Sequence, residues 1–302
     1  MSEKHDTSIV LVAVGEASAA SICDALEDIV KGPGPAGIRA LGSVDGLSAA
    51  EADLPAISPE DREQILSELG GEGLDAAILP RVKRLKGLLI SDMDSTIIGQ
   101  ECLDELADFA GLKAEVSAIT ERAMRGELDF EGALTTRVAM LKGLGLDALQ
   151  AAYEERITLN PGARTLVATM KANGAETVLV SGGFTFFTGR VAAAAGFNAH
   201  RGNTLIDDGA ALTGEVGLPI LGREAKLAAL DEFAAAAGLA REDTIALGDG
   251  ANDLAMIKAA GLGIAYKAKP IVAVEAHAAI NYTDLRAALF FQGYHASEFV
   301  EG

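Results

Sequence analysis

Residues 85–99 read LKGLLISDMDSTIIG, a short apolar run followed at once by two aspartates, Asp92 and Asp94. The run has the length of a strand, and the acids lie where a buried strand would end. Side chains alternate between the faces of a strand, so we expect Asp92 and Asp94 on one side and Met93 on the other. Buried acids need a partner or a function. The stretch therefore predicts a strand that delivers two carboxylates to a site.

The same element recurs along the chain: a short apolar strand, a glycine or acid at its carboxyl end, then a helix. It returns as ETVLVSGG at 176–183 and as DTIALGDG at 243–250, and further strands are expected at 261–266 and 278–284. Strands that alternate with helices predict the α/β class and a Rossmann-like parallel sheet with right-handed crossovers. Ligands of such sheets bind beyond the carboxyl ends of the strands, where these acids would gather.

Two segments interrupt this pattern. Residues 100–159 have mostly helical patterns and are too long for a crossover helix, so we expect a helical cap inserted over the site. Residues 203–216 carry Asp-Asp-Gly between apolar flanks and predict a β-hairpin. The sheet and its cap together are expected to form one domain at residues 85–302.

Residues 1–84 predict a small α/β N-terminal domain without a glycine-rich phosphate loop or a catalytic cluster. The basic RVKRLK marks its join to the rest of the chain. Ser58 stands at the N-cap position of a helix. The elements expected here are a strand at 8–14, helices at 17–31 and 57–69, and a loop at 31–37.

The composition of the 302-residue chain argues against several classes of partner and location. Its formal net charge is −19, which argues against nucleic acid as a partner and against docking on anionic membrane. No apolar run reaches the roughly 18 residues that span a bilayer, and we expect no signal peptide. Cys23 and Cys102 lie far apart without metal-site spacing, so a reduced, cytoplasmic location is expected.

The aspartate pair indicates metal and phosphate chemistry. Two like charges on one face repel, and a cation beside them removes the conflict. Hard carboxylate oxygens suit Mg²⁺, which pairs naturally with a substrate phosphate. An ionised aspartate can also attack phosphorus while a second carboxyl group transfers protons. The alternative is a pair of strand-end acids that cap a turn, and DMDST alone does not decide between the two.

Later motifs supply what such a site needs. GDGANDLAMIKAAG at 248–261 places Asp249 at a strand end and Asp253 at a helix start, although Asp253 alone could be a helix-terminal acid. Ser181 and its glycines offer a hydroxyl and backbone N–H groups for phosphoryl oxygens, or a plain turn. Lys226 lies on a predicted helix, where a lone lysine is usually solvated.

Taken in this order, the motifs resemble the haloacid dehalogenase (HAD) superfamily of phosphohydrolases, over residues 85 to about 290. Its signature is a strand-end Asp-x-Asp-x-Thr/Val, then Ser/Thr, then Lys, then Gly-Asp-x-x-x-Asp. The resemblance implies Asp92 as nucleophile and Asp94 as general acid and base. It implies that Ser181, Gly182 and Lys226 bind the phosphoryl group. It also implies that Asn252 belongs to the loop that binds the substrate. It implies Mg²⁺ held by Asp92, the main-chain carbonyl of Asp94 and Asp249, with Asp253 acting near the metal through water.

The cap motifs, DMDSTIIGQECLDELAD and ITERAMRGELDFEGALTTRVAML, closely resemble the phosphoserine phosphatase family. In that family a Glu faces the substrate amino group, which implies Glu101, and a cap Arg pairs with the substrate carboxylate, which implies Arg137. Met124 and Phe130 match the apolar residues that close over the ligand. This is chemically sensible, since guanidinium binds carboxylate through two parallel bonds. Singly, these residues could instead be a helix-start acid, a surface Arg and two core side chains.

The expected activity is therefore Mg²⁺-dependent hydrolysis of phosphoserine through an aspartyl-phosphate, the last step of serine biosynthesis. The alternatives are another HAD phosphatase or phosphotransferase with a different small phosphorylated metabolite, and a non-catalytic amino-acid sensor on a retired phosphatase fold. Some bacterial members of the family carry a preceding amino-acid-binding regulatory domain, and residues 1–84 could be a reduced version of this ACT-like domain. They could equally be a packing domain or pair two copies as a homodimer.

Overall fold

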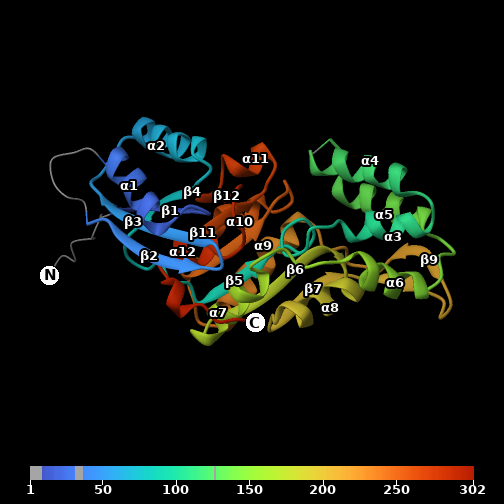
Figure 1. Ribbon diagram of the computed structural model, residues 1–302. Helices are drawn as coiled ribbons and strands as arrows, with labels where there is room; N and C mark the ends of the chain where they lie inside the picture. The colour runs from blue at the N-terminus through green and yellow to red at the C-terminus, as the bar shows by residue number, and fades with distance from the viewer. Residues whose placement is uncertain (1–8, 31–36, 126) are drawn as a thin grey trace.

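The computed structural model describes residues 9–30, 37–125 and 127–302. Figure 1 shows an N-terminal unit in blue, a central sheet, and a group of green helices at the opposite end. The loop predicted at 31–37 falls almost wholly outside the described residues, as does the first residue of the strand predicted at 8–14. Within these ranges, no helix is long and apolar enough to cross a membrane.

The central sheet has six parallel strands in the order β12-β11-β10-β5-β6-β7. β5 lies between β10 and β6, so the acids that follow it emerge between the ends of the other two motif-bearing strands. The strand at 199–203 was not predicted, because its sequence AHRGN has no apolar run. The six strands are β5 (Leu88–Ser91), β6 (Glu176–Phe184), β7 (Ala199–Asn203), β10 (Thr244–Gly248), β11 (Leu262–Tyr266) and β12 (Ala278–Ile280).

Helices cover both faces of this sheet, as the apolar strand sequences require. Leu88 and Ile90 of β5 pack in one core with residues of α9 and α10. Leu89, between them, faces the other core, with residues of α7, α8 and α12. The helices are α7 (Ala163–Ala172), α8 (Thr185–Ala195), α9 (Arg223–Ala236), α10 (Leu254–Ala259), α11 (Pro270–Ala273) and α12 (Ala287–Gln292), with 3-10 turns at Arg241–Asp243 and Ala296–Glu298.

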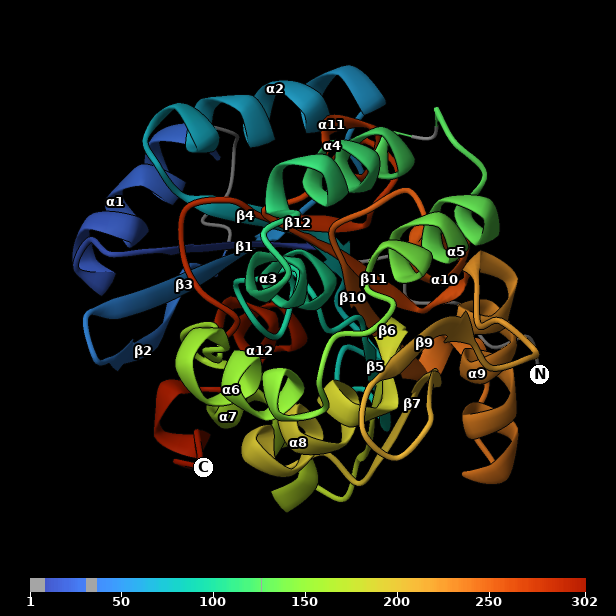
Figure 2. The same ribbon diagram turned by 90° about the vertical axis from the view of Figure 1, so that its right-hand side faces the viewer.

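The segment predicted as a helical cap forms helices between β5 and β6. These are α3 (Cys102–Phe109), α4 (Lys113–Met124), α5 (Phe130–Met140) and α6 (Asp147–Arg156). In Figure 2, α3 lies in the middle of this group, in front of the central sheet. The hairpin predicted at 203–216 is confirmed as β8 (Leu205–Asp207) and β9 (Leu212–Val216), and Leu212 exchanges backbone hydrogen bonds with Gly143 and Leu144.

The N-terminal unit is an antiparallel sheet in the order β2-β3-β1-β4 with two helices, a βαββαβ arrangement. The Ser58 hydroxyl accepts the Asp61 N–H at 3.0 Å, so the predicted N-cap is confirmed. Its elements are β1 (Ile9–Gly15), α1 (Ala19–Ile29), β2 (Arg39–Val44), β3 (Leu47–Leu54), α2 (Pro59–Gly71) and β4 (Asp75–Pro80).

Both faces of this N-terminal sheet are buried. Along β1, Leu11 and Ala13 pack against the unit's own helices. Val10 and Val12 point the opposite way, into the same core as α12 of the central sheet. β1 is therefore apolar at successive positions because it lies between two cores, and the N-terminal unit packs directly on the part of the chain that carries the motifs.

Candidate active site

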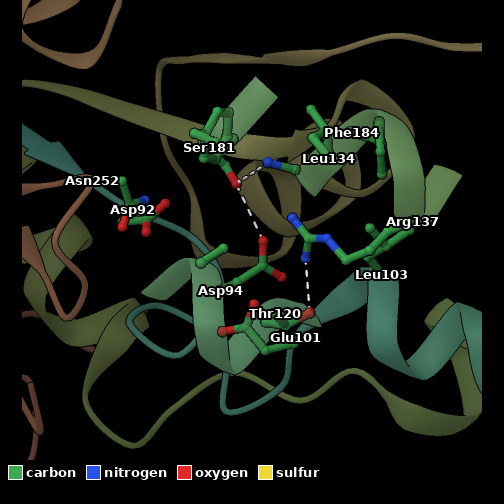
Figure 3. Close-up of a pocket in the computed structure, with 14 residues that line it drawn as sticks. Asp92, Asp94, Glu101, Leu103, Thr120, Leu134, Arg137, Ser181, Phe184 and Asn252 are labelled. Carbon is green, nitrogen blue, oxygen red and sulfur yellow. Dashed lines mark hydrogen bonds between the residues drawn. The ribbon is translucent and has the colours of Figure 1, made fainter. Parts of the chain in front are cut away.

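The sequence motifs meet in one pocket at the carboxyl edge of the central sheet. Asp92 and Asp94 both line it, while Met93 between them is fully buried in the core, as strand alternation predicts. Figure 3 shows Ser181 joined to Asp94 by a hydrogen bond, and Asn252 beside Asp92. The strand order explains the meeting, because β6 and β10 flank β5.

Lys226 is the cation at the base of this site. Its ammonium lies 2.8 Å from Asp92 Oδ1 and 2.6 Å from Asp253 Oδ1, and the side chain is 1% exposed. Burial alone would lower the pKa of Lys226, but the charges of Asp253 and Asp92 outweigh it and raise that pKa. The alternative of a solvated helix lysine is therefore wrong. α9 packs against the sheet and carries its lysine inward.

The acidic residues form a cluster that fits a divalent cation. Oxygen atoms of Asp92, Asp249 and Asp253 lie within 4.8 Å of one another. With Lys226 as the cation paired to two of them, three carboxylates exceed one ammonium by two negative charges. Burial, together with the charge of Asp253, raises the pKa of both Asp92 and Asp249 well above the usual range. A hard cation with oxygen ligands would relieve this conflict.

Asp253 also fixes the loop that carries Asp249. Its Oδ2 accepts the N–H of Asp249 at 3.3 Å and that of Gly250 at 3.1 Å. Thr96 adds a hydroxyl 3.4 Å from Asp249 Oδ1. The side chain of Asp253 therefore has two partners in addition to the other acids of the cluster. These partners are the loop backbone and Lys226.

Asp94 has a separate environment. Its Oδ1 accepts the Cys102 N–H at 2.8 Å, and its Oδ2 accepts the Ser181 hydroxyl at 3.2 Å. Burial nevertheless raises the pKa of Asp94 above the usual aspartate value. A carboxyl group with a raised pKa, close to a nucleophile, is suited to donate and recover a proton.

The two glycines after Ser181 keep the pocket open. A Cβ on Gly182 would lie 2.7 Å from the Phe130 ring, and one on Gly183 would lie 2.9 Å from Asp94 Oδ2. The Gly183 N–H donates to the Ser181 hydroxyl at 2.8 Å. Backbone and hydroxyl groups can thus approach a ligand closely at this end of β6.

The other end of the pocket is built by the cap helices. Glu101 and Arg137 line it together with Phe130, and the Glu101 carboxylate accepts the Ser95 hydroxyl at 2.6 Å. Burial, and then the charge of Asp94, raises the pKa of Glu101. Arg137 is 7% exposed, so the alternative of a surface arginine is wrong. Met124 ends α4, and its side chain lies outside the described part of the chain.

Sequence reasoning missed several residues of the cap end, among them Thr120, Leu103 and Leu134. Thr120 receives a hydrogen bond from Arg137 at 2.8 Å and donates one to Asp104 at 2.6 Å. Asp104, which does not line the pocket itself, had a local signal, because it lies on α3 three positions after Glu101, the N-cap of that helix.

The chain is similar to known proteins over much of its length. Residues 89–258 match the family model of haloacid dehalogenase-like hydrolases. The chain is 48% identical over 204 residues to the phosphoserine phosphatase of Streptococcus thermophilus, covering 68% of the chain and 94% of that relative. It is 41% identical over 256 residues to the phosphoserine phosphatase of Streptomyces coelicolor, covering 83% of the chain but only 62% of that relative's length. A solved phospho-aspartyl intermediate analogue of phosphoserine phosphatase is 40% identical with a TM-score of 0.65, covering 68% of this chain and 99% of that one.

Proposed function

The chain belongs to the haloacid dehalogenase-like hydrolases, and on that premise we propose that it hydrolyses O-phospho-L-serine to L-serine and inorganic phosphate. The observation that carries the proposal is the composition of one pocket. Asp92 and Asp94 lie at its sheet end, and a carboxylate and a buried guanidinium, Glu101 and Arg137, line its cap end. Such a pocket complements a phosphate at one end and an amino acid at the other.

In the first step, an ionised Asp92 oxygen attacks phosphorus in line, and the bond from phosphorus to the serine oxygen breaks. The product on the enzyme is an aspartyl-phosphate. Asp94 gives its proton to the departing serine oxygen, a role that suits a carboxyl group whose pKa burial has raised. Lys226 keeps Asp92 oriented through their 2.8 Å ion pair and lies close to the developing charge.

In the second step, Asp94 takes a proton from water as the water oxygen attacks phosphorus. The bond between phosphorus and Asp92 breaks, so the carboxylate returns to its starting state and phosphate leaves. The Ser181 hydroxyl and the Gly182 backbone would hold phosphoryl oxygens through both steps, with Asn252 on the opposite side.

We propose Mg²⁺ as the cofactor, because the acidic cluster sets three carboxylates beside one ammonium and consists of oxygen ligands. Asp92, Asp249 and the main-chain carbonyl of Asp94 would hold it, with Asp253 acting through water. When bound, Mg²⁺ neutralises charge on the cluster and on the phosphate oxygens.

At the cap end, Glu101 would accept the substrate ammonium and Arg137 would bind its carboxylate. Phe130 and Met124 would close over the ligand and exclude bulk water. The reaction would supply serine for biosynthesis in a reducing cytoplasm, which suits the free Cys23 and Cys102. For residues 1–84, an ACT-like regulatory role and the pairing of two copies as a homodimer both stay predictions.

The experiment is a phosphate-release screen over phosphorylated metabolites with Mg²⁺ present. We expect phosphoserine to be the preferred substrate by a wide margin over sugar phosphates. A preference for a sugar phosphate, or transfer of the phosphoryl group to an added alcohol in place of water, would refute the proposal. Asp92→Asn is the matched control, since its phosphate release reports only contaminating activity.

A further inference from the structure

Arg137 is a buried cation that has no direct carboxylate partner. Its Nε donates to the Ala133 carbonyl at 3.2 Å and its Nη1 donates to the Thr120 hydroxyl at 2.8 Å. Among the ion pairs of the described residues, none involves the Arg137 guanidinium. In Figure 3 the guanidinium extends into the pocket toward Asp94, with its one dashed bond running to Thr120.

The hydroxyl of Thr120 links this cation to a buried acid. A hydroxyl has a single proton to donate, and two acceptors are near it: Asp104 Oδ1 at 2.6 Å and the Val116 carbonyl at 3.1 Å. The shorter bond to the charged acceptor is the stronger, so the proton points to Asp104. The lone pairs of the oxygen are then left for Arg137. Both Thr120 and Asp104 are nearly fully buried, which fixes the geometry of the link.

A hydroxyl between the two charges has a particular consequence. Asp104 stabilises the buried guanidinium through Thr120, but it does not occupy the guanidinium's own donors. The Nη2 group and the second Nη1 proton therefore stay available for a ligand with two oxygens. A direct Asp–Arg pair would have taken up those donors.

We propose that Thr120 and Asp104 are positioning residues that make Arg137 selective for the carboxylate of the substrate. Thr120 sets the orientation of the guanidinium, and Asp104 orients the Thr120 proton and balances the buried charge from a distance. This inference rests on the proposed function and deepens it, because it locates specificity in two residues that touch neither phosphate nor metal ligand.

The test uses the full-length protein with two substrates that differ by one group. O-phosphoethanolamine is phosphoserine without its carboxylate. Thr120→Val removes the hydroxyl at nearly constant volume, and Thr120→Ser restores it. Thr136→Val is the matched control, because Thr136 is exposed on the same helix as Arg137 and its hydroxyl bonds a carbonyl four residues back, as one contact of Thr120 does.

We expect Thr120→Val to lower kcat/KM for phosphoserine by about 10- to 100-fold, the effect of a hydrogen bond to a charged group. The loss should lie in KM, since the carboxylate is bound alike before and during the reaction. The values for O-phosphoethanolamine should stay within about twofold of wild type. Thr120→Ser and Thr136→Val should resemble wild type on both substrates, and Asp104→Asn should show a smaller version of the Thr120→Val loss.

Three results would distinguish a failure of this inference from a failure of the proposed function. Equal losses on both substrates would mean that Thr120 only supports the packing of α4, and would overturn the inference. Unchanged phosphoserine kinetics in Thr120→Val would overturn it as well. A wild-type enzyme that does not prefer phosphoserine to O-phosphoethanolamine would overturn the proposed function itself, and the positioning role with it.

Discussion

Asp75→Ala is expected to destabilise the whole chain by about 3–5 kcal/mol. Asp75 begins β4, is 2% exposed, and accepts hydrogen bonds at 2.5–3.3 Å from the N–H groups of Asn281, Tyr282 and Thr283 and from the Thr283 hydroxyl. Thr283 is buried, so its N–H would lose its acceptor at about 1–3 kcal/mol. Asn281 and Tyr282 are exposed, so water can replace the acceptor of their N–H groups at a smaller cost. These smaller costs, together with the lost bond of the Thr283 hydroxyl, make up the rest of the expected destabilisation.

Urea unfolding followed by circular dichroism measures this change at neutral pH. The wild type should unfold in one transition, because Val10 and Val12 of the N-terminal sheet share a core with α12. Asp24→Ala, at an exposed position of α1, is the matched control and should lie within about 0.5 kcal/mol of wild type. A loss below about 1 kcal/mol for Asp75→Ala would refute the reasoning, as would two wild-type transitions. Phosphoserine turnover by the folded variant should be unchanged, since Asp75 does not line the pocket.

Asp92→Asn should abolish phosphate release without unfolding the chain, because an amide cannot attack phosphorus; more than a few per cent of wild-type release would contradict it. Arg137→Ala should weaken use of phosphoserine by about 2–5 kcal/mol in kcat/KM and spare a small aryl phosphate, as steady-state kinetics would show. Chelation should abolish turnover, Mg²⁺ should restore it and Ca²⁺ should not, because Ca²⁺ accepts more ligands in looser geometry. Burial lowers the pKa of His277, whose Nδ1 accepts the Gly263 N–H at 2.8 Å. Stability should therefore fall as pH drops from about 6.5 toward that lowered pKa, and less so in His277→Asn, by urea midpoints measured across pH.

The parts of the fold that sequence could predict are those with a strong local signal. Each of the strands β5, β6 and β10 combines an apolar run with a strand-end acid or glycine. Such a local pattern predicts a strand without any knowledge of the tertiary structure. β7 lacks that signal, because AHRGN forms a strand by pairing with β6 and has one fully buried residue, Asn203. The pattern also does not reveal that Val10 and Leu11 face different cores.

The residues of the site likewise divide into those with a local sequence signal and those without one. Asp92, Asp94 and Asp249 stand at strand ends, so the parallel topology alone brings them together. Lys226 and Thr120 have no such signal, because a lysine or threonine on a helix has the same sequence pattern whether it faces water or a site. Their burial follows from how α9 packs on the sheet and α4 on α3 and α5, which depends on the tertiary structure.

The two buried cations of the pocket explain how a chain with a net charge of −19 can take an anionic substrate. Lys226 already pairs with Asp92 and Asp253, so its charge is offset within the acidic cluster. Arg137 is held by a hydroxyl and a carbonyl, so N–H donors of its guanidinium stay available at the cap end. With all three carboxylates ionised and no metal bound, the phosphate end would repel a phosphate dianion, while the Arg137 guanidinium would still attract a carboxylate at the cap end. On the proposed function, a divalent cation would admit the phosphate as well as stabilise its transfer, so one metal ion would serve both substrate binding and catalysis.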